Sequence, residues 1–151
     1  MSLGGGEFLR RLVFDQPFRN LIYHRIGKAK YFVCFLLKPS KITKINKSMN
    51  LGYHTRLVHA FNTYLNAYSI GDNFTCYHNV TVGCMKGGRP TIGNNVTISC
   101  GASILGGVHI GSNVNIGAGC IVTKSIPDNC TVIGNPAIIV RKDGKSVHIM
   151  L

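Results

Sequence analysis

The fold of this chain is decided by residues 91–122, which read TIGNNV TISCGA SILGGV HIGSNV NIGAGC IV. The second residue of each printed group of six is apolar, and we call it the leading residue of its hexad. The same spacing continues upstream across a single step of ten residues. The leading residues are Ile70, Cys76, Val82, Ile92, Ile98, Ile104, Ile110, Ile116 and Val122. Glycine often follows the leading residue, and asparagine is common in the turns. An alternating β-sandwich does not generate a strict period of six.

The repeat predicts a coil with three flat faces. Each hexad forms a short strand whose leading side chain points inward, and Gly or Asn occupies the corner, where positive φ is tolerable. Three hexads make one coil of about 18 residues, and coils stack about 4.8 Å apart by parallel pairing. The period continues backwards from Leu57 to Ile45 if one extra residue lies near Thr63-Tyr64. We expect roughly four to five coils, which end near Thr123.

The first part of the chain differs in kind. The 151 residues carry 17 Lys and Arg against 5 Asp and Glu, a formal net charge of +12, and ten of these cations lie in the first fifty positions. Asp15 is a suitable N-cap for a helix that begins near Pro17. An almost wholly apolar run, Tyr31 to Leu37, follows this helix. The segment is expected either to cap the next domain or to lie on an anionic membrane surface. Nucleic acid is not expected, because no binding motif accompanies the charge.

We therefore divide the chain into a basic helical segment (1–44), a mainly β domain (45–141) and a C-terminal tail (142–151). No export signal is evident, and the six cysteines lack C-x-x-C spacing. We expect reduced thiols that mostly fill the core, no zinc site, and a cytoplasmic protein. If the N-terminal segment lies on a membrane and does not cap the next domain, the protein is expected to be peripheral at its inner face.

The register of the hexads predicts a column of side chains at one corner. Two positions beyond the leading residue, successive coils carry His59, His78, Cys100 and Ala118. His59 and His78 should lie on adjacent coils, about 5 Å apart along the axis. A groove of small residues that ends at two imidazoles suits a long, thin cofactor.

The repeat resembles that of the hexapeptide-repeat acyltransferases, which implies a left-handed parallel β-helix, an exception to the right-handed crossover rule. Several segments resemble the serine acetyltransferase group in particular, over roughly residues 45 to 141. They are Leu57 to Phe61, Ile70 to Asn73, Val80 to Gly83, Gly87 to Gly93, Ile104 to Val108, Gly117 to Gly119, Val122 to Pro127 and Ile133 to Ala137.

This resemblance implies that His59 is the general base and that acetyl-CoA lies in a groove between two subunits of a homotrimer, with no metal. His78 is the second catalytic candidate; it is expected to orient the acceptor, to assist as an acid, or to fill the corner. Resemblance to galactoside-type acetyltransferases places Cys100, Ala118, Thr123, Lys124 and Arg141 at the cofactor. Lys and Arg also suit nucleotide phosphates chemically.

Two departures bear on the acceptor. Lys44 stands near the position where serine acetyltransferases have a supporting Asp, and Arg89-Pro90 replaces a second His before Pro. They favour a sugar hydroxyl of capsule or lipopolysaccharide precursors as the acceptor, with L-serine in second place. The segment Cys84 to Arg89 is expected to overhang a groove beside the site and to select the acceptor.

Two functions of a different kind are weighed against acyl transfer. The first is a zinc site of carbonic anhydrase type, built from His54, His59 and His78. The order of these histidines along the chain differs from the order in that family, which disfavours the zinc site. The second is a non-catalytic β-helix that serves as a scaffold or binding module.

Overall fold

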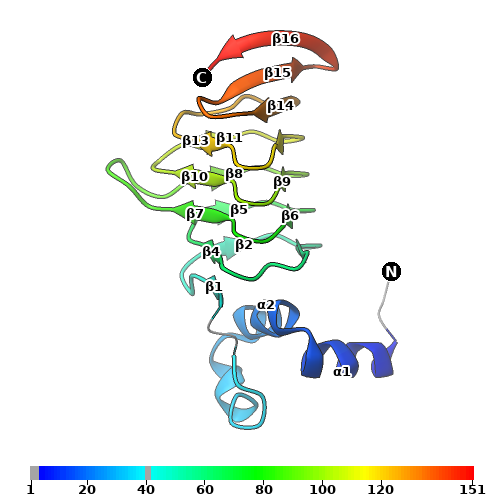
Figure 1. Cartoon of the computed structure of the whole chain (residues 1–151). Helices are drawn as coiled ribbons and strands as arrows, with labels where there is room; N and C mark the ends of the chain where they lie inside the picture. The colour runs from blue at the N-terminus through cyan, green and yellow to red at the C-terminus, as the bar shows by residue number, and fades with distance from the viewer. Residues whose placement is uncertain (1–3, 40–41) are drawn as a thin grey trace.

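The computed structural model describes residues 4–39 and 42–151. A triangular solenoid of three sheets stands above a group of helices, and the C-terminus lies near the far end (Figure 1). Sheet A contains β1 (Thr43–Ile45), β4 (Thr63–Leu65), β7 (Thr81–Gly83), β10 (Ser103–Leu105) and β13 (Ile121–Val122). Sheet B contains β2 (Asn50–Leu51), β5 (Ser69–Ile70), β8 (Thr91–Ile92) and β11 (His109–Ile110). Sheet C contains β3 (Arg56–Leu57), β6 (Thr75–Cys76), β9 (Thr97–Ile98), β12 (Asn115–Ile116), β14 (Cys130–Ile133), β15 (Ile138–Lys142) and β16 (Lys145–Met150).

The predicted hexapeptide β-helix is confirmed, with about five coils. The leading side chains form one continuous core, and Ile98, Ile104 and Ile110 are completely buried. Three cysteines fill this core as expected, namely Cys76, Cys120 and Cys130. Burial raises the pKa of the Cys76 thiol to about 12, so it stays protonated and behaves as an apolar group.

Asparagines supply the positive φ that one corner requires. Asn73, Asn95, Asn113 and Asn129 have φ of 56° to 57°. Their side chains form a ladder in which each amide donates to the next at 2.9 Å, and the ladder ends on the carboxylate of Asp143. His54, also at φ 56°, lies below this ladder, because the Asn73 N–H donates to the carbonyl of its neighbour Tyr53.

The glycines that follow leading residues have a different role from the one we expected. Gly71 does not adopt positive φ; instead, a Cβ there would clash with Asn94 Oδ1 and lie 2.7 Å from the carbonyl carbon of Gly93. Gly52, Gly93 and Gly111 meet the next coil in the same way. Glycine is required here because successive coils approach too closely for a side chain, while asparagine adopts the left-handed conformation.

The irregular first coil differs from prediction in detail. Leu57 pairs with Cys76, as the spacing of nineteen predicts. Leu65, however, takes the inward position on β4, eight positions after Leu57 and five before Ile70. Instead of one extra residue near Thr63-Tyr64, the corner after β3 holds two extra residues and the next corner holds one fewer.

The N-terminal segment forms α1 (Gly5–Phe14), α2 (Gln16–Ile26) and the short 3₁₀ helix η1 (Gly27–Phe32). The Asp15 side chain caps α2 by accepting from the Phe18 N–H at 3.0 Å, as predicted. Arg19 is buried and donates to the carbonyls of Leu12, Val13 and Lys38, which ties α1 and the segment after η1 to α2.

Helix α2 covers the open end of the first coil (Figure 1). Asn20 donates to the carbonyl of Thr43 in β1, and Arg25 donates to the carbonyls of Leu51 and Gly52. These bonds satisfy backbone acceptors that no further coil pairs with, so the segment acts as a cap. Within residues 4–39 and 42–151, no helix is long and apolar enough to cross a membrane.

The other end of the solenoid is closed by a hairpin. Strand β14 continues sheet C in parallel with β12, and β15 and β16 then add antiparallel strands. Residues 142–151, which we set apart as a tail, thus include all of β16.

Candidate active site

The corner between sheets C and A carries the predicted column. The N–H of Gly119 donates to the carbonyl of Cys100, and the N–H of Gly101 donates to that of His78, so Ala118, Cys100 and His78 occupy equivalent positions on successive coils. The next bond down runs from Asn79 N–H to the carbonyl of Phe61. The residue below His78 is therefore Phe61.

This corrects the prediction that His59 lies directly below His78. The rings of Phe61 and His78 stack with centroids 5.0 Å apart and an interplanar angle of 16°. The two extra residues after β3 move His59 out of the column and put Phe61 into it. Both histidines still belong to the same corner of adjacent coils.

His59 is held in an uncommon backbone conformation. Its φ is 46°, and its carbonyl accepts from the Phe61 N–H at 2.7 Å, which closes a tight turn around buried Ala60. The hydroxyl of Thr43 donates to the Ala60 carbonyl and anchors the turn to the first coil. The His59 side chain itself is exposed. A non-glycine residue held at positive φ is a frequent feature of functional sites.

Lys44, which stands near the expected position of a supporting acid, pairs with Tyr64 in the register of β1 and β4, within sheet A.

The cofactor candidates lie on different parts of the prism. Cys100 and Ala118 line the histidine corner. Thr123 and Lys124 are exposed and follow β13, so they lie at the opposite edge of sheet A. Arg141 is exposed on β15, near the C-terminal end of sheet C. One chain therefore brings Cys100 and Ala118 together with His78, but it does not bring Lys124 and Arg141 to the same corner.

The ten-residue step forms a projecting loop after β7 (Figure 1). Met85 and Gly88 exchange backbone hydrogen bonds of 3.2 and 2.9 Å across its tip. Its base is held by Arg89, which donates to Ser48 Oγ at 2.9 Å and lies 5.8 Å from the centre of the Tyr68 ring. His78 lies before β7, and the loop lies after β7. The strand, about 10 Å long, therefore separates His78 from the loop.

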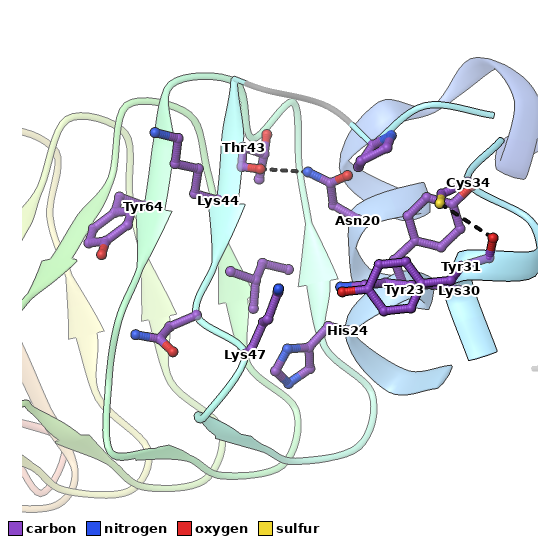
Figure 2. A pocket seen from close by; sticks show the side chains of 13 residues that line it. Asn20, Tyr23, His24, Lys30, Tyr31, Cys34, Thr43, Lys44, Lys47 and Tyr64 are labelled. Atoms are coloured by element: carbon purple, nitrogen blue, oxygen red, sulfur yellow. Dashed lines mark hydrogen bonds between the residues drawn. The ribbon is translucent and has the colours of Figure 1, made fainter. Parts of the chain in front are cut away.

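A cavity that no sequence pattern signalled lies between α2, η1 and the first coil (Figure 2). It holds about 540 Å³ and is lined by basic and aromatic side chains, among them Lys30, Lys44, Lys47, Tyr31 and Tyr64. Burial first, and then the charge of Arg25, lower the pKa of His24 on its wall. Periodicity could not reveal the cavity, since it arises where two separate structures dock.

The arrangement of His, Cys, Asp and Glu side chains bears on a metal site. In the part of the chain that the structure describes, no group of three or more His, Cys, Asp or Glu side chains is arranged to hold a metal ion.

Known proteins resemble the chain in both sequence and fold. Residues 89–124 match the family described as bacterial transferase hexapeptide (six repeats). A serine acetyltransferase from Staphylococcus xylosus is 37% identical over 139 residues, which cover 85% of this chain and 64% of that protein.

Solved structures of serine acetyltransferases are also similar to this chain in fold. Serine acetyltransferase from Neisseria gonorrhoeae superimposes with a TM-score of 0.76 at 31% identity, covering 93% of this chain and 59% of that one. The same enzyme in complex with serine gives 0.70. The Brucella abortus serine acetyltransferase in complex with coenzyme A gives 0.73 at 28% identity, covering 93% of this chain and 62% of that one. The chain thus spans less than two thirds of the length of these relatives.

The repeat, the solenoid and these similarities are those of the hexapeptide-repeat acyltransferases. Among these proteins, the chain is similar to the serine acetyltransferases.

Proposed function

We propose that the chain is an acetyl-CoA-dependent O-acetyltransferase and that its acceptor is L-serine. The observation that carries this proposal is the 37% identity to a serine acetyltransferase across 85% of the chain, with a histidine held at the corner where the resemblance implies the base. The sequence alone favoured a sugar acceptor; these relatives reverse that ranking.

The proposed chemistry is a direct transfer. Neutral His59 takes the proton from the acceptor hydroxyl while the oxygen attacks the thioester carbonyl of acetyl-CoA. The C–S bond then breaks, and the proton passes from His59 to the departing thiolate, which leaves as the coenzyme A thiol. Imidazole suits this role because its pKa lies near neutrality, so that it can accept a proton from the hydroxyl and then give it to the thiolate.

The residues expected to bind the cofactor lie apart in one chain, which supports a site between subunits. Cys100 and Ala118 lie at one edge of sheet A, whereas Thr123 and Lys124 lie at the other. In the proposed homotrimer, the histidine corner of one copy faces the edge of its neighbour that carries Lys124. The acetyl group then lies at His59, and Lys124 and Arg141 hold the nucleotide phosphates.

A second candidate acceptor is a hydroxyl of a larger molecule, such as a sugar. The observation that favours it is the absence of Asp and Glu from residues 16–71, so that no carboxylate of this segment is present to bind the ammonium group of serine. Lys44 and Tyr64 stand side by side in the first two coils instead.

The test is coenzyme A release with purified full-length protein. Thiol release from acetyl-CoA is followed with L-serine, with free sugars and without acceptor, and the acetylated product is identified by mass spectrometry. O-Acetylserine as the main product supports the proposal. Acetylated sugar and no O-acetylserine identifies the second candidate, and no thiol release with any acceptor refutes acyl transfer.

A further inference from the structure

The segment that follows α2 displays large apolar side chains that are mostly exposed to solvent. Phe32, Phe35 and Leu36 are 87%, 83% and 75% exposed, and Tyr31 is 63% exposed. Isolated exposed apolar residues are ordinary, but four large ones within six positions are a local concentration that calls for a partner. We call Tyr31, Phe32, Phe35 and Leu36 the aromatic tip.

The backbone beneath the aromatic tip is ordered by specific bonds. The N–H groups of Val33 and Cys34 donate to the Lys30 carbonyl, and those of Leu36 and Leu37 donate to the Val33 carbonyl. Two buried side chains of α2 hold the far end, since Tyr23 donates to the Leu37 carbonyl and Arg19 to the Lys38 carbonyl. The aromatic rings therefore point outward from a fixed scaffold.

Cations flank the aromatic tip along the chain. Lys28 and Lys38 are exposed, and the Nζ of Lys30 lies 5.5 Å from the centre of the Tyr31 ring. Residues 16–71 contain no Asp or Glu that would neutralise them. A second copy of this surface would bring lysines against lysines, which opposes pairing of two tips.

We propose that the aromatic tip docks on an anionic lipid bilayer, with its rings at the headgroup boundary and Lys28, Lys30 and Lys38 against lipid phosphates. Exposed aromatic side chains flanked by lysines suit the surface of a bilayer, where the acyl interior is apolar and the headgroups are anionic. This docking is independent of the proposed acetyl transfer. Its consequence is positional: α2 bonds to Thr43, and Thr43 bonds to Ala60 beside His59, so the candidate base lies in the coil nearest the bilayer.

Vesicle flotation of the full chain tests the proposal. The protein is mixed with vesicles of phosphatidylcholine alone, or with vesicles in which about one third is phosphatidylglycerol. We expect binding to the anionic vesicles only, and weaker binding as salt is raised, because the attraction acts over a Debye length. Failure to bind the anionic vesicles at low salt, or equal binding to neutral ones, overturns the proposal.

Variants assign the binding to this surface. Phe32→Ser with Phe35→Ser should lower partitioning at least about tenfold, since each ring buries apolar area in the bilayer. Lys28→Gln with Lys38→Gln should lower it by about fivefold for each charge. Met150→Ser, which changes a 57% exposed side chain in β16, is the matched control and should bind as the parent does.

The same variants expose the competing occupant. The native mass and melting temperature of each variant are measured without lipid. If the Phe32→Ser, Phe35→Ser protein floats as well as the parent, the aromatic tip is not the docking surface. If that variant instead loses an oligomer that the parent forms, the tip is covered by another copy, and the proposal is wrong.

Discussion

The ring of His78 lies flat on the ring of Phe61, with centroids 5.0 Å apart. This contact exists because the corner after β3 contains two extra residues, so that Phe61 and not His59 takes the position below His78. The stack fixes the orientation of the His78 ring, and His59 remains free to face a substrate from the neighbouring turn.

The first prediction concerns the proposed base. His59→Asn removes the imidazole but keeps a residue that tolerates positive φ, so the fold is retained. We expect kcat to fall by about 10²–10⁴-fold, the usual contribution of a positioned general base. His54→Asn is the matched control, because His54 has φ 56° and lies at another corner. Loss of activity in both variants, or in neither, removes His59 from the proposed mechanism.

The second prediction concerns the stacked pair. Phe61→Leu releases the ring of His78, and His78→Gln removes it. If His78 assists the reaction from the orientation that Phe61 sets, each variant lowers kcat by about tenfold, or 1.4 kcal/mol, and the double variant loses no more than either single one. Steady-state kinetics with acetyl-CoA measures this. Additive losses would mean that the two side chains act separately.

The third prediction separates the roles of glycine. Gly71→Ala places a Cβ 2.7 Å from the backbone of the next coil, and we expect it to cost about 1–3 kcal/mol of unfolding free energy. Gly83→Ala is the control, because its Cβ would meet only the side chains of Leu105 and Thr81, at 3.4 and 3.7 Å. Urea unfolding should show a change within about 0.5 kcal/mol for this control. Equal costs would show that coil spacing does not select glycine.

The fourth prediction concerns the asparagine ladder. Asn95→Gly keeps the backbone conformation and removes two amide hydrogen bonds, from Asn73 and to Asn113. Asn95→Ala removes the same bonds and also forces Ala to positive φ, which adds about 1–2 kcal/mol. The unfolding free energy should therefore be highest for the parent, lower for Asn95→Gly and lowest for Asn95→Ala. Equal stability of the Gly and Ala variants would contradict the conformational argument.

The fifth prediction is a pH dependence of stability. Burial beside Arg25 holds the pKa of His24 below its usual value, so the unfolded chain binds this proton more readily than the folded one. The contribution of His24 is fully present above its unfolded pKa of about 6.5 and is lost as the pH falls below that value and through the lower pKa of the folded state. As the pH is lowered from about 8 to 5, the melting temperature of His24→Gln should fall less steeply than that of the parent. His148→Gln, which changes an exposed histidine, is the matched control, and an unchanged slope in His24→Gln would contradict the assignment.

Much of this molecule followed from the sequence alone. The six-residue period predicted the coil, the inward residues and the pairing of Leu57 with Cys76, because a repeating backbone repeats its hydrogen bonds. Asp15 marked the start of α2 for a local reason, the need of its first N–H groups for an acceptor. The column of His78, Cys100 and Ala118 also followed, since the coils there keep the regular spacing.

Only the tertiary structure decided where the repeat is broken and what docks against it. Counting residues located one insertion but not its division between two corners, which depends on which side chain the core accepts, here Leu65. Arg19 is buried because three backbone carbonyls from two distant segments converge on it, and no sequence pattern marks that convergence. The aromatic tip and the cavity beside it likewise depend on how α2 meets the first coil. A periodic sequence specifies the contacts that repeat along the chain, whereas contacts made once, between unlike segments, depend on packing in three dimensions.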